Sequence, residues 1–356
     1  MKNSNWNSRR EFVKKASLAG ISLSFPFPEI PNFMKGYELG IVVHSYGMRS
    51  SGRLQSAEFP AFQNALDFMN HCHEIGARGI QTVVNGWQSD FSKKVREERE
   101  RKGMYLEGSI GLPKTNEDVA RFEADILAAK EAGATVVRSV CLNGRRYENF
   151  SSRQEFMDFK KGAIQSLHLA EPTVRKHQIK LAIENHKDWK AAELAEILKQ
   201  LGSEWVGATV DFGNNVSLIE DPNEVIETLA PYAFSTHIKD MGVQEYEDGF
   251  LLSEVPLGEG IVDLKKGMDL CKKYNPQVTF SLEMITRDPL KVPCLTDGYW
   301  GTFDNPKARD FARHLAMIKK KSFSGGLQKT SGLTDSEKLN LEEKNVVQCI
   351  QWANSQ

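Results

Sequence analysis

Four polar residues in the second half of the sequence each end or interrupt a short apolar run, and these residue types bind metals and move protons. They are Glu184 after 181–183, Asp211 after 206–210, His237 within 233–238 and Glu283 after 278–282. A carboxylate or imidazole at the end of a buried strand is costly to desolvate unless a metal ion or an opposite charge receives it. A single polar residue at a strand end is also found where a strand simply runs out into solvent. Its repetition in four successive runs predicts a shared site.

Three carboxylates and one imidazole suit a single divalent ion, with Mn²⁺ or Mg²⁺ preferred and Co²⁺ or Zn²⁺ acceptable. An ion chelated by a ketone oxygen and the neighbouring hydroxyl acidifies the C–H between them and stabilises the enediolate that forms. Two carboxylates on opposite faces can remove that proton and return one from the other side. If the enediolate carries a leaving group at the β position, elimination competes, so the four ligands leave epimerase and lyase chemistry open.

Strands and helices alternate regularly from Glu38 onward, and this alternation determines where the four residues lie. We count eight strand–helix pairs in about 280 residues, which predicts an α/β protein with the fold of a (β/α)8 TIM barrel. The carboxyl ends of barrel strands meet at one rim, where catalytic groups gather. A doubly wound open sheet is the alternative, but no G-x-G-x-x-G turn follows the first strand.

The remaining sequence divides into three expected parts: a signal or N-terminal extension over 1–35, the barrel over 36–322, and a linker with a helical tail over 323–356. Within the barrel we expect a helix over 153–177 that is interrupted near Pro172, an irregular acidic segment over 244–254, and a last helix over 306–320. The tail helix, 335–353, is expected to pack outside the barrel as a C-terminal helical extension.

Four sequence blocks resemble the sugar phosphate isomerase/epimerase family, which shares the xylose isomerase-like barrel. The blocks are Ala182-Ile-Glu-Asn-His186, Asp211-Phe-Gly-Asn214, His237-Ile-Lys-Asp240 and Leu257-Gly-Glu-Gly-Ile-Val-Asp263, and the resemblance runs from about Glu38 to Lys320. It implies that Glu184, Asp211, His237 and Glu283 bind one divalent metal ion. It also implies that Glu184 and Glu283 form the proton-transfer pair. The blocks are specific to the superfamily and not to one substrate.

Five further residues are candidates for binding substrate. His186 is either a hydrogen-bonding group for the substrate or a structural histidine, and Lys239 either holds a substrate oxygen or is a solvated rim lysine. Arg287, four residues past the last strand, is a candidate for a substrate hydroxyl or carboxylate. Arg138 and Glu107 lie near the ends of the fourth and third strands, where each contacts substrate or pairs with the other.

The amino-acid composition and net charge limit which kinds of partner the protein can bind. The 356 residues carry 46 Lys plus Arg against 47 Asp plus Glu, so the net charge of -1 offers no basic field for nucleic acid. The same superfamily includes DNA-repair endonucleases, but their metal clusters need more histidine than the eight present here. The expected partner is therefore a small-molecule carbohydrate. A non-catalytic sugar-binding barrel would not need two facing carboxylates, and the sequence leaves open whether the chain forms a homo-oligomer.

The N-terminal segment Ser8-Arg9-Arg10-Glu11-Phe12-Val13-Lys14 precedes a mildly apolar run over 16–27. The paired arginines resemble a bacterial twin-arginine signal, which implies export of the folded protein to the periplasm. The run is too short for a stable membrane span in the mature protein. The alternative is an amphipathic extension of a cytoplasmic protein.

Overall fold

A computed structural model describes residues 36–304 and 307–356. The twin-arginine signal predicted in residues 1–35 lies outside these residues.

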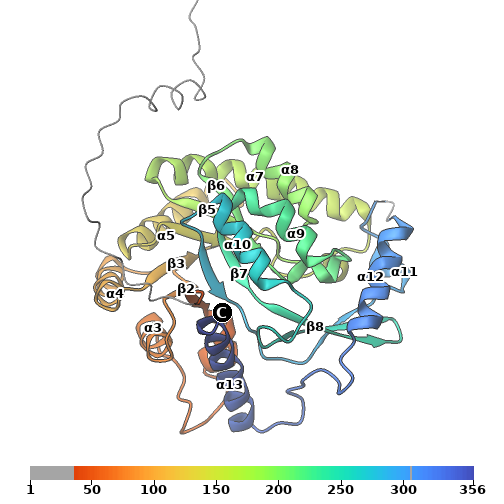
Figure 1. The fold of residues 1–356 in the computed structure, drawn as a ribbon. Helices are drawn as coiled ribbons and strands as arrows, with labels where there is room; N and C mark the ends of the chain where they lie inside the picture. Colours follow the sequence, from red (N-terminus) through yellow and green to blue (C-terminus); the bar gives the residue numbers. More distant parts are fainter. Residues whose placement is uncertain (1–35, 305–306) are drawn as a thin grey trace, which may run out of the picture. The chain divides into compact units, whose positions relative to one another are not determined.

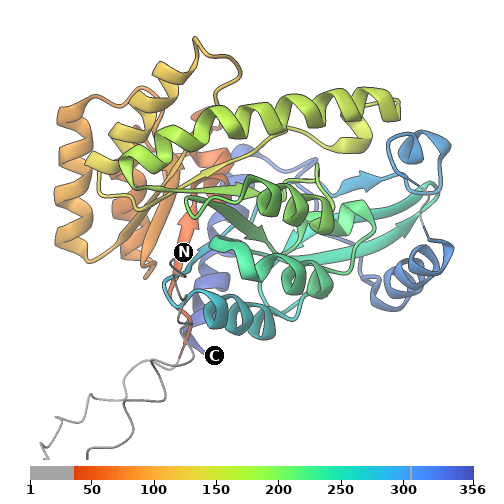
Figure 2. The same ribbon diagram turned by 90° about the horizontal axis from the view of Figure 1, so that it is seen from above.

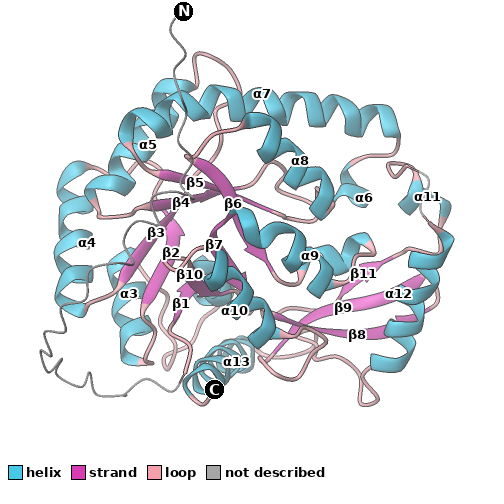
Figure 3. Cartoon of the chain, turned by 45° about the horizontal axis from the view of Figure 1, so that its top comes forward, coloured by secondary structure: helices cyan, strands magenta, loops and turns pink. Residues whose placement is uncertain are grey.

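Eight parallel strands close into a barrel, which confirms the predicted (β/α)8 TIM barrel. Neighbouring strands follow the order β1-β10-β7-β6-β5-β4-β3-β2, and Figure 3 shows them surrounded by helices. The strands are β1 (Leu39–Val42), β2 (Gly79–Val83), β3 (Tyr105–Ser109), β4 (Val136–Ser139), β5 (Lys180–Glu184), β6 (Val206–Asp211), β7 (Ala233–Ile238) and β10 (Thr279–Leu282).

The register of the strands brings the predicted site residues to one level of the barrel. Asp211 of β6 pairs directly with His237 of β7, and His237 pairs with Ser281 of β10. Glu184 is the last residue of β5, beside Thr209 of β6. Every residue of β6 is buried, as expected for a parallel strand covered by helices on one side and by barrel side chains on the other.

The barrel helices that follow β1 to β9 are amphipathic and pack around the strands. They are α3 (Ala65–Glu74), α4 (Ser89–Lys102), α5 (Val119–Glu131), α7 (Arg153–His177), α8 (Ala191–Leu201), α9 (Pro222–Leu229) and α10 (Leu264–Tyr274). Figure 2 shows α7 as a long yellow-green helix running beside the strands. The expected interruption near Pro172 is wrong, because α7 continues through it. Pro172 and His168, whose carbonyl would otherwise accept the missing bond, are both exposed to water.

Short helices connect the strand ends to these longer ones. They are the 3₁₀ helices η1 (Val43–Tyr46), η2 (Asn214–Leu218) and η3 (Ala230–Tyr232) and the α-helices α2 (Gly47–Ser51), α6 (Arg146–Asn149) and α11 (Asp297–Trp300). Both η1 and η2 directly follow strands that end in the candidate site.

The expectation of an irregular segment over 244–254 is wrong. β8 (Asp240–Tyr246) and β9 (Gly249–Val255) form an antiparallel hairpin, and β11 (Leu290–Val292) adds a third strand to this separate sheet. Tyr246 pairs with Gly249, so the turn has two central residues, Glu247 and Asp248. Gly249 has φ +152°, a conformation that an L side chain rarely adopts. Most residues of β8 and β9 are buried, so neither strand has the alternation of buried and exposed residues that would mark it in the sequence.

Two long helices follow the barrel strands, and only the first lies elsewhere than expected. α12 (Ala308–Lys321), expected as the last barrel helix, packs against β8 of the separate sheet (Figure 3). α13 (Asp335–Asn354) is the predicted C-terminal helical extension and lies beside the segment that leads into β1, where Tyr37 N donates to Ala353 O at 3.0 Å (Figure 1).

Side-chain contacts tie α13 to two other parts of the barrel. Its Asn345 donates to Thr286 beyond β10 at 2.9 Å, and its Gln348 donates to Glu259 before α10 at 2.7 Å. α13 thus covers the outer side of the barrel where the ring closes. Among the described residues, no helix combines the length and apolar character needed to cross a membrane.

Candidate metal centre and active site

The ends of β5, β6, β7 and β10 bring Glu184, Asp211, His237 and Glu283 into one buried cluster. One ligand atom from each of the four lies within 4.8 Å of all the others. The imidazole is central: His237 Nδ1 lies 3.5 Å from Glu184 Oε2, 3.6 Å from Asp211 Oδ2 and 3.6 Å from Glu283 Oε1. Carboxylate oxygens from three strands therefore converge on the same ring nitrogen.

Hydrogen bonds beneath the cluster hold the imidazole of His237 in place. His237 Nε2 lies 2.8 Å from Gln81 Oε1, and Gln81 Nε2 donates to Glu107 Oε2 at 2.7 Å. Ser235 and Thr279 also donate to the Glu107 carboxylate. Because the amide oxygen of Gln81 can only accept a hydrogen bond, it pairs with Nε2–H, and Nδ1 is the ring nitrogen that faces the carboxylates and can bind a cation.

Two atoms of this network lack hydrogen-bond partners in the described part of the chain, and they are suited to binding a divalent cation. His237 Nδ1 and Asp211 Oδ2 are both buried, and neither has a hydrogen-bond partner among the described residues, although Lys239 Nζ approaches Asp211 Oδ2 to 2.8 Å as an ion pair. Burial opposes a charged imidazole, but Glu184 and Glu283 outweigh it and raise the pKa of His237 well above its usual range. The site therefore favours a positive charge beside Nδ1, which a bound cation supplies.

Arg138 and Asn214 position the Glu184 carboxylate. Arg138 Nε donates to Glu184 Oε2 at 2.6 Å, and Asn214 Nδ2 donates to Glu184 Oε1 at 2.9 Å. Burial raises the pKa of Glu184, but the charges of Arg138 and His237 outweigh it and leave the pKa well below its usual range. Glu184 is thus held as a carboxylate, which is the form that a base or a metal ligand needs.

Lys239 and His44 position Glu283 on the other side. Lys239 Nζ donates to Glu283 Oε2, and His44 Nδ1 lies 3.2 Å from Glu283 Oε1. Burial raises the pKa of Glu283, but Lys239 and His237 together hold it well below its usual range. Asp211 is oriented differently, because its Oδ1 accepts two backbone N–H groups, from Gly213 and Asn214 at the start of η2.

The other predicted substrate residues lie at different depths. His186 is anchored through Nδ1, 3.0 Å from Leu142 O, and burial lowers its pKa to about 4, so it is neutral near pH 7. Arg287 forms a bidentate ion pair with Glu254 of β9. Glu107 does not pair with Arg138. It lies behind Gln81, and its role as a substrate ligand stays a prediction that no contact here supports.

Sequence reasoning missed Lys187 and also the supporting roles of Gln81 and Asn214. Lys187 follows His186 in the β5–α8 loop with φ +67°, and its ammonium donates to Asn214 Oδ1. Burial and the nearby Lys239 lower the pKa of Lys187 to about 8. The block Asp211-Phe-Gly-Asn214 contained one of these three residues, but nothing in a single sequence marks an amide or a loop lysine as part of a site.

The cluster reaches solvent beside His44 and Arg287, whose side chains are 44% and 29% exposed. Glu184, Asp211 and His237 are fully buried, and the side chain of Arg138 is 7% exposed. Charged groups in such a shielded place interact more strongly than they do in water.

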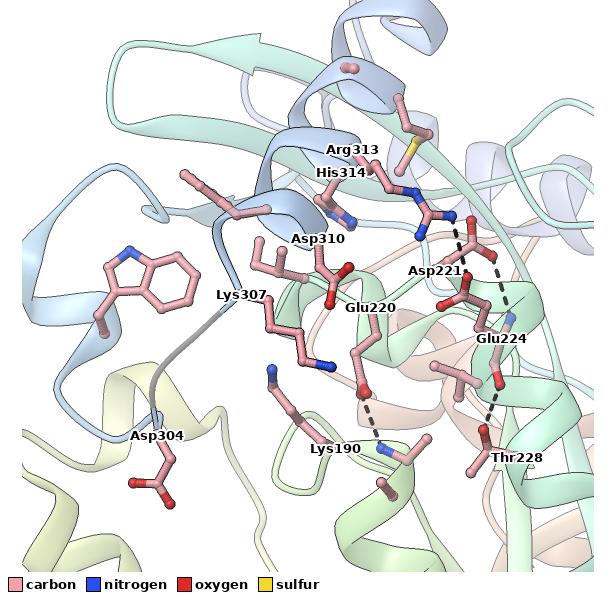
Figure 4. Close-up of a pocket in the computed structure, with 18 residues that line it drawn as sticks. Lys190, Glu220, Asp221, Glu224, Thr228, Asp304, Lys307, Asp310, Arg313 and His314 are labelled. Atoms are coloured by element: carbon pink, nitrogen blue, oxygen red, sulfur yellow. Dashed lines mark hydrogen bonds and ion pairs between the residues drawn. The ribbon is translucent and has the colours of Figure 1, made fainter.

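A separate cavity of about 640 Å³ lies between α8, α9 and α12 and contains none of these residues (Figure 4). Its walls carry charges of both signs, and several are already engaged: Arg313 pairs with Glu224, and Glu220 accepts the backbone N–H of Ala191. We therefore place the candidate active site at the barrel rim and not in this cavity.

A closed eight-stranded barrel with a carboxylate–imidazole cluster at its carboxyl rim defines the class of this protein. The family model for the xylose isomerase-like TIM barrel matches residues 69–321. The chain belongs to that family, which confirms this part of the resemblance read from the four sequence blocks.

Two curated relatives match parts of the chain. One is the uncharacterized protein YihM of Escherichia coli, 24% identical over 233 residues, which cover 64% of this chain and 66% of the relative. The other is 3-oxo-isoapionate decarboxylase of Pectobacterium atrosepticum, 31% identical over 103 residues, which cover 28% of this chain and 38% of that enzyme. The matches thus span less than two thirds of each relative's own length.

Solved structures share the fold at low sequence identity. A xylose isomerase-like TIM barrel protein from Mycobacterium smegmatis in complex with magnesium has a TM-score of 0.54 and 16% identity, over 80% of this chain and 97% of that one. The apo form of 3-keto-D-glucoside 4-epimerase from E. coli has a TM-score of 0.52 and 13% identity, over 80% of this chain and 99% of that one.

Proposed function

We propose that this protein is a divalent-metal-dependent isomerase or epimerase that moves a proton next to the carbonyl of a small carbohydrate. The observation that carries this proposal is the convergence of two buried carboxylates, Glu184 and Glu283, on one point. They come from β5 and β10, which are separated in the barrel by β6 and β7. A substrate held between them presents one carbon to both.

The four-residue cluster suits Mn²⁺ or Mg²⁺ best, because three of its ligands are carboxylates, while Co²⁺ or Zn²⁺ would also be accepted. Bound there, such an ion would polarise a substrate carbonyl and stabilise the negative charge that develops on its oxygen during deprotonation. Glu184, Asp211, His237 and Glu283 would hold it.

The protein's own groups supply the proton transfer. Arg138 and Lys239 keep Glu184 and Glu283 ionised, so either carboxylate can accept the proton from the carbon next to the carbonyl. The other carboxylate takes a proton from water and donates it to the opposite face of the same carbon, after which the first carboxylate releases its proton to water. His186, neutral near pH 7 and anchored through Nδ1, offers Nε2 to a substrate hydroxyl, and Arg287 borders the entrance.

A carbon–oxygen lyase acting on a 3-keto-glycoside or a dehydroshikimate-like ring is the second candidate. Lys239 favours it, because a buried ammonium in contact with Glu283 can protonate a departing oxygen at the β position. The curated relative named as a decarboxylase is also consistent with carbanion chemistry other than epimerisation, since loss of carbon dioxide next to a carbonyl generates the same kind of charge.

The test is a panel of ketoses and 3-keto-glycosides incubated with the full chain and Mn²⁺ in deuterium oxide. Deuterium in recovered or epimerised sugar marks proton transfer, whereas release of an aglycone with an unsaturated keto-sugar marks elimination. We expect Glu184→Gln and Glu283→Gln to lose turnover at least 10³-fold, while Glu247→Gln, in the exposed β8–β9 turn, keeps it. Substantial activity in both variants would overturn the proton-transfer assignment.

A further inference from the structure

Lys187 is a buried ammonium that the proposed proton transfer does not use. It lies in the β5–α8 loop, three residues after Glu184, and is 5% exposed. Its backbone is fixed in a left-handed conformation, and its carbonyl accepts the N–H of Arg146 at 2.9 Å. A lysine kept in such a place against the cost of desolvation needs a compensating charge.

No carboxylate supplies that charge, because Lys187 has no acidic oxygen within 4.0 Å among residues 36–304 and 307–356. The neighbouring carboxylates are engaged elsewhere. Glu254 pairs with Arg287, and Asp211 pairs with Lys239. Asp188 accepts the backbone N–H groups of His186 and Trp189.

Two ammonium groups meet at one neutral oxygen here, but among the described residues only that of Lys239 also contacts carboxylates, those of Glu283 and Asp211. Lys187 Nζ and Lys239 Nζ both donate to Asn214 Oδ1, the second at 3.3 Å. Like charges brought together in a buried site repel each other, and an amide oxygen offsets this only weakly. Asn214 also donates to Glu184 Oε1, so the two ammonium groups lie beside the candidate metal centre.

We propose that Lys187 binds a carboxylate of the substrate, so that the natural substrate is a keto-sugar acid and not a neutral ketose. This inference rests on the proposed function, because it places the carboxylate on the molecule whose carbonyl meets the metal centre. A carboxylate fits better than a phosphate. It carries a single charge, which matches the one ammonium here that has no carboxylate partner among the described residues, and no glycine-rich loop in that part of the chain adjoins Lys187.

Three probes with one carbon skeleton test this proposal: D-fructose, D-fructuronate and D-fructose 6-phosphate. They differ only in the group at the end remote from the ketone, which is a hydroxymethyl, a carboxylate or a phosphate. Dissociation constants are measured by calorimetry on the Mn²⁺-loaded full chain, on Lys187→Met, on Lys187→Arg and on Lys199→Met. Lys199 is an exposed lysine of α8 and serves as the matched control.

We expect the wild-type chain and Lys199→Met to bind D-fructuronate at least tenfold more tightly than D-fructose. Lys187→Met should reduce this advantage to less than threefold, and Lys187→Arg, which keeps the charge, should retain most of it. The proposal is overturned if the wild-type chain shows no advantage for the acid, if Lys187→Met keeps the advantage, or if only the phosphate binds more tightly. The wild-type comparison needs no variant to fold.

Repeating the titrations without metal separates this inference from the proposed function. If the acid keeps its Lys187-dependent advantage but the chain binds no divalent ion and exchanges no deuterium, the anion site stands and the proposed function falls. If metal binding and deuterium exchange are present but the acid has no advantage, the proposed function stands and the anion site falls.

Discussion

His237 Nδ1 and Asp211 Oδ2 lie 3.6 Å apart at the centre of the barrel rim, and neither atom has a hydrogen-bond partner among the described residues. Asp211 Oδ2 has the Lys239 ammonium, 2.8 Å away, as an ion-pair partner. Buried polar atoms are almost always satisfied, so the unpartnered His237 Nδ1 beside this carboxylate marks a place where a cation belongs. The surroundings are well ordered, because Asp211 Oδ1 and His237 Nε2 both have defined partners. This contrast distinguishes a prepared cation site from a loosely packed one.

Gln81 should control metal affinity although it touches no carboxylate of the cluster. Gln81→Leu removes the acceptor for His237 Nε2–H, so the ring and its Nδ1 lone pair are no longer fixed. We expect the dissociation constant for Mn²⁺ to rise about 10- to 100-fold, measured by competition with a fluorescent chelator. Gln200→Leu, on the exposed face of α8, is the control. An unchanged affinity in Gln81→Leu would show that this hydrogen bond does not position the ligand.

α13 should be required for a stable fold. Its Leu339, Val346 and Ile350 are at most 3% exposed, and burying each side chain contributes about 1.5–3 kcal/mol. Together these three contributions approach the whole free energy of unfolding of an ordinary domain, about 5–15 kcal/mol. A chain ending at Leu333 should therefore lose its cooperative thermal transition, whereas a chain ending at Asn354 should keep it. A truncated chain that melts like the full one would exclude this role.

Stability should fall in mild acid because of His314 in α12. The imidazole is 5% exposed beside Phe250, and burial lowers its pKa to about 4. In the unfolded chain the pKa is about 6.5. Between these values the unfolded chain binds a proton that the folded chain does not, so unfolding becomes easier as the pH falls from about 6.5 to 4.

The loss assigned to His314 is at most about 3 kcal/mol. His314→Met should flatten this part of the pH profile in urea unfolding experiments, and His168→Gln, at an exposed position of α7, should not. Equal slopes for His314→Met and the wild-type chain between pH 6.5 and 4 would contradict the assignment.

Export is proposed from the N-terminal sequence and can be tested separately. Replacing Arg9 and Arg10 with lysine should move the full chain from the periplasmic to the cytoplasmic fraction of a bacterial host, because the paired arginines are what resembles the signal. Lys2→Gln lies outside the motif and is the control. A wild-type chain found entirely in the cytoplasm would favour the cytoplasmic alternative.

The strand ends were predictable from sequence because a parallel barrel turns position along the chain into position in space. Apolar runs that end in Glu184, Asp211, His237 and Glu283 must present these residues at one rim once the barrel closes. The partners of these residues were harder to predict. Arg138 and Lys239 were candidates for substrate contact, and the structure shows that they also pair with the carboxylates of the cluster.

Other features depend on contacts that no local pattern encodes. Lys187 is buried in a loop where its own backbone is left-handed. Gln81 acts through His237, which is 156 residues away in sequence. α12 has the periodicity of a barrel helix but packs on β8, because β8, β9 and β11 form a second sheet that also needs covering. The order of the helices along the chain therefore did not predict which one closes the ring.

Metal stoichiometry tests most directly whether the cluster of Glu184, Asp211, His237 and Glu283 binds a divalent ion. The full chain is dialysed against Mn²⁺, freed of loosely bound ions and analysed by mass spectrometry, alongside Asp211→Asn, His237→Gln and the control His168→Gln. We expect about one ion per chain for the wild type and the control, and less than about a tenth of that for Asp211→Asn and His237→Gln. No bound ion in the wild type, or an undiminished content in both ligand variants, would contradict this metal assignment.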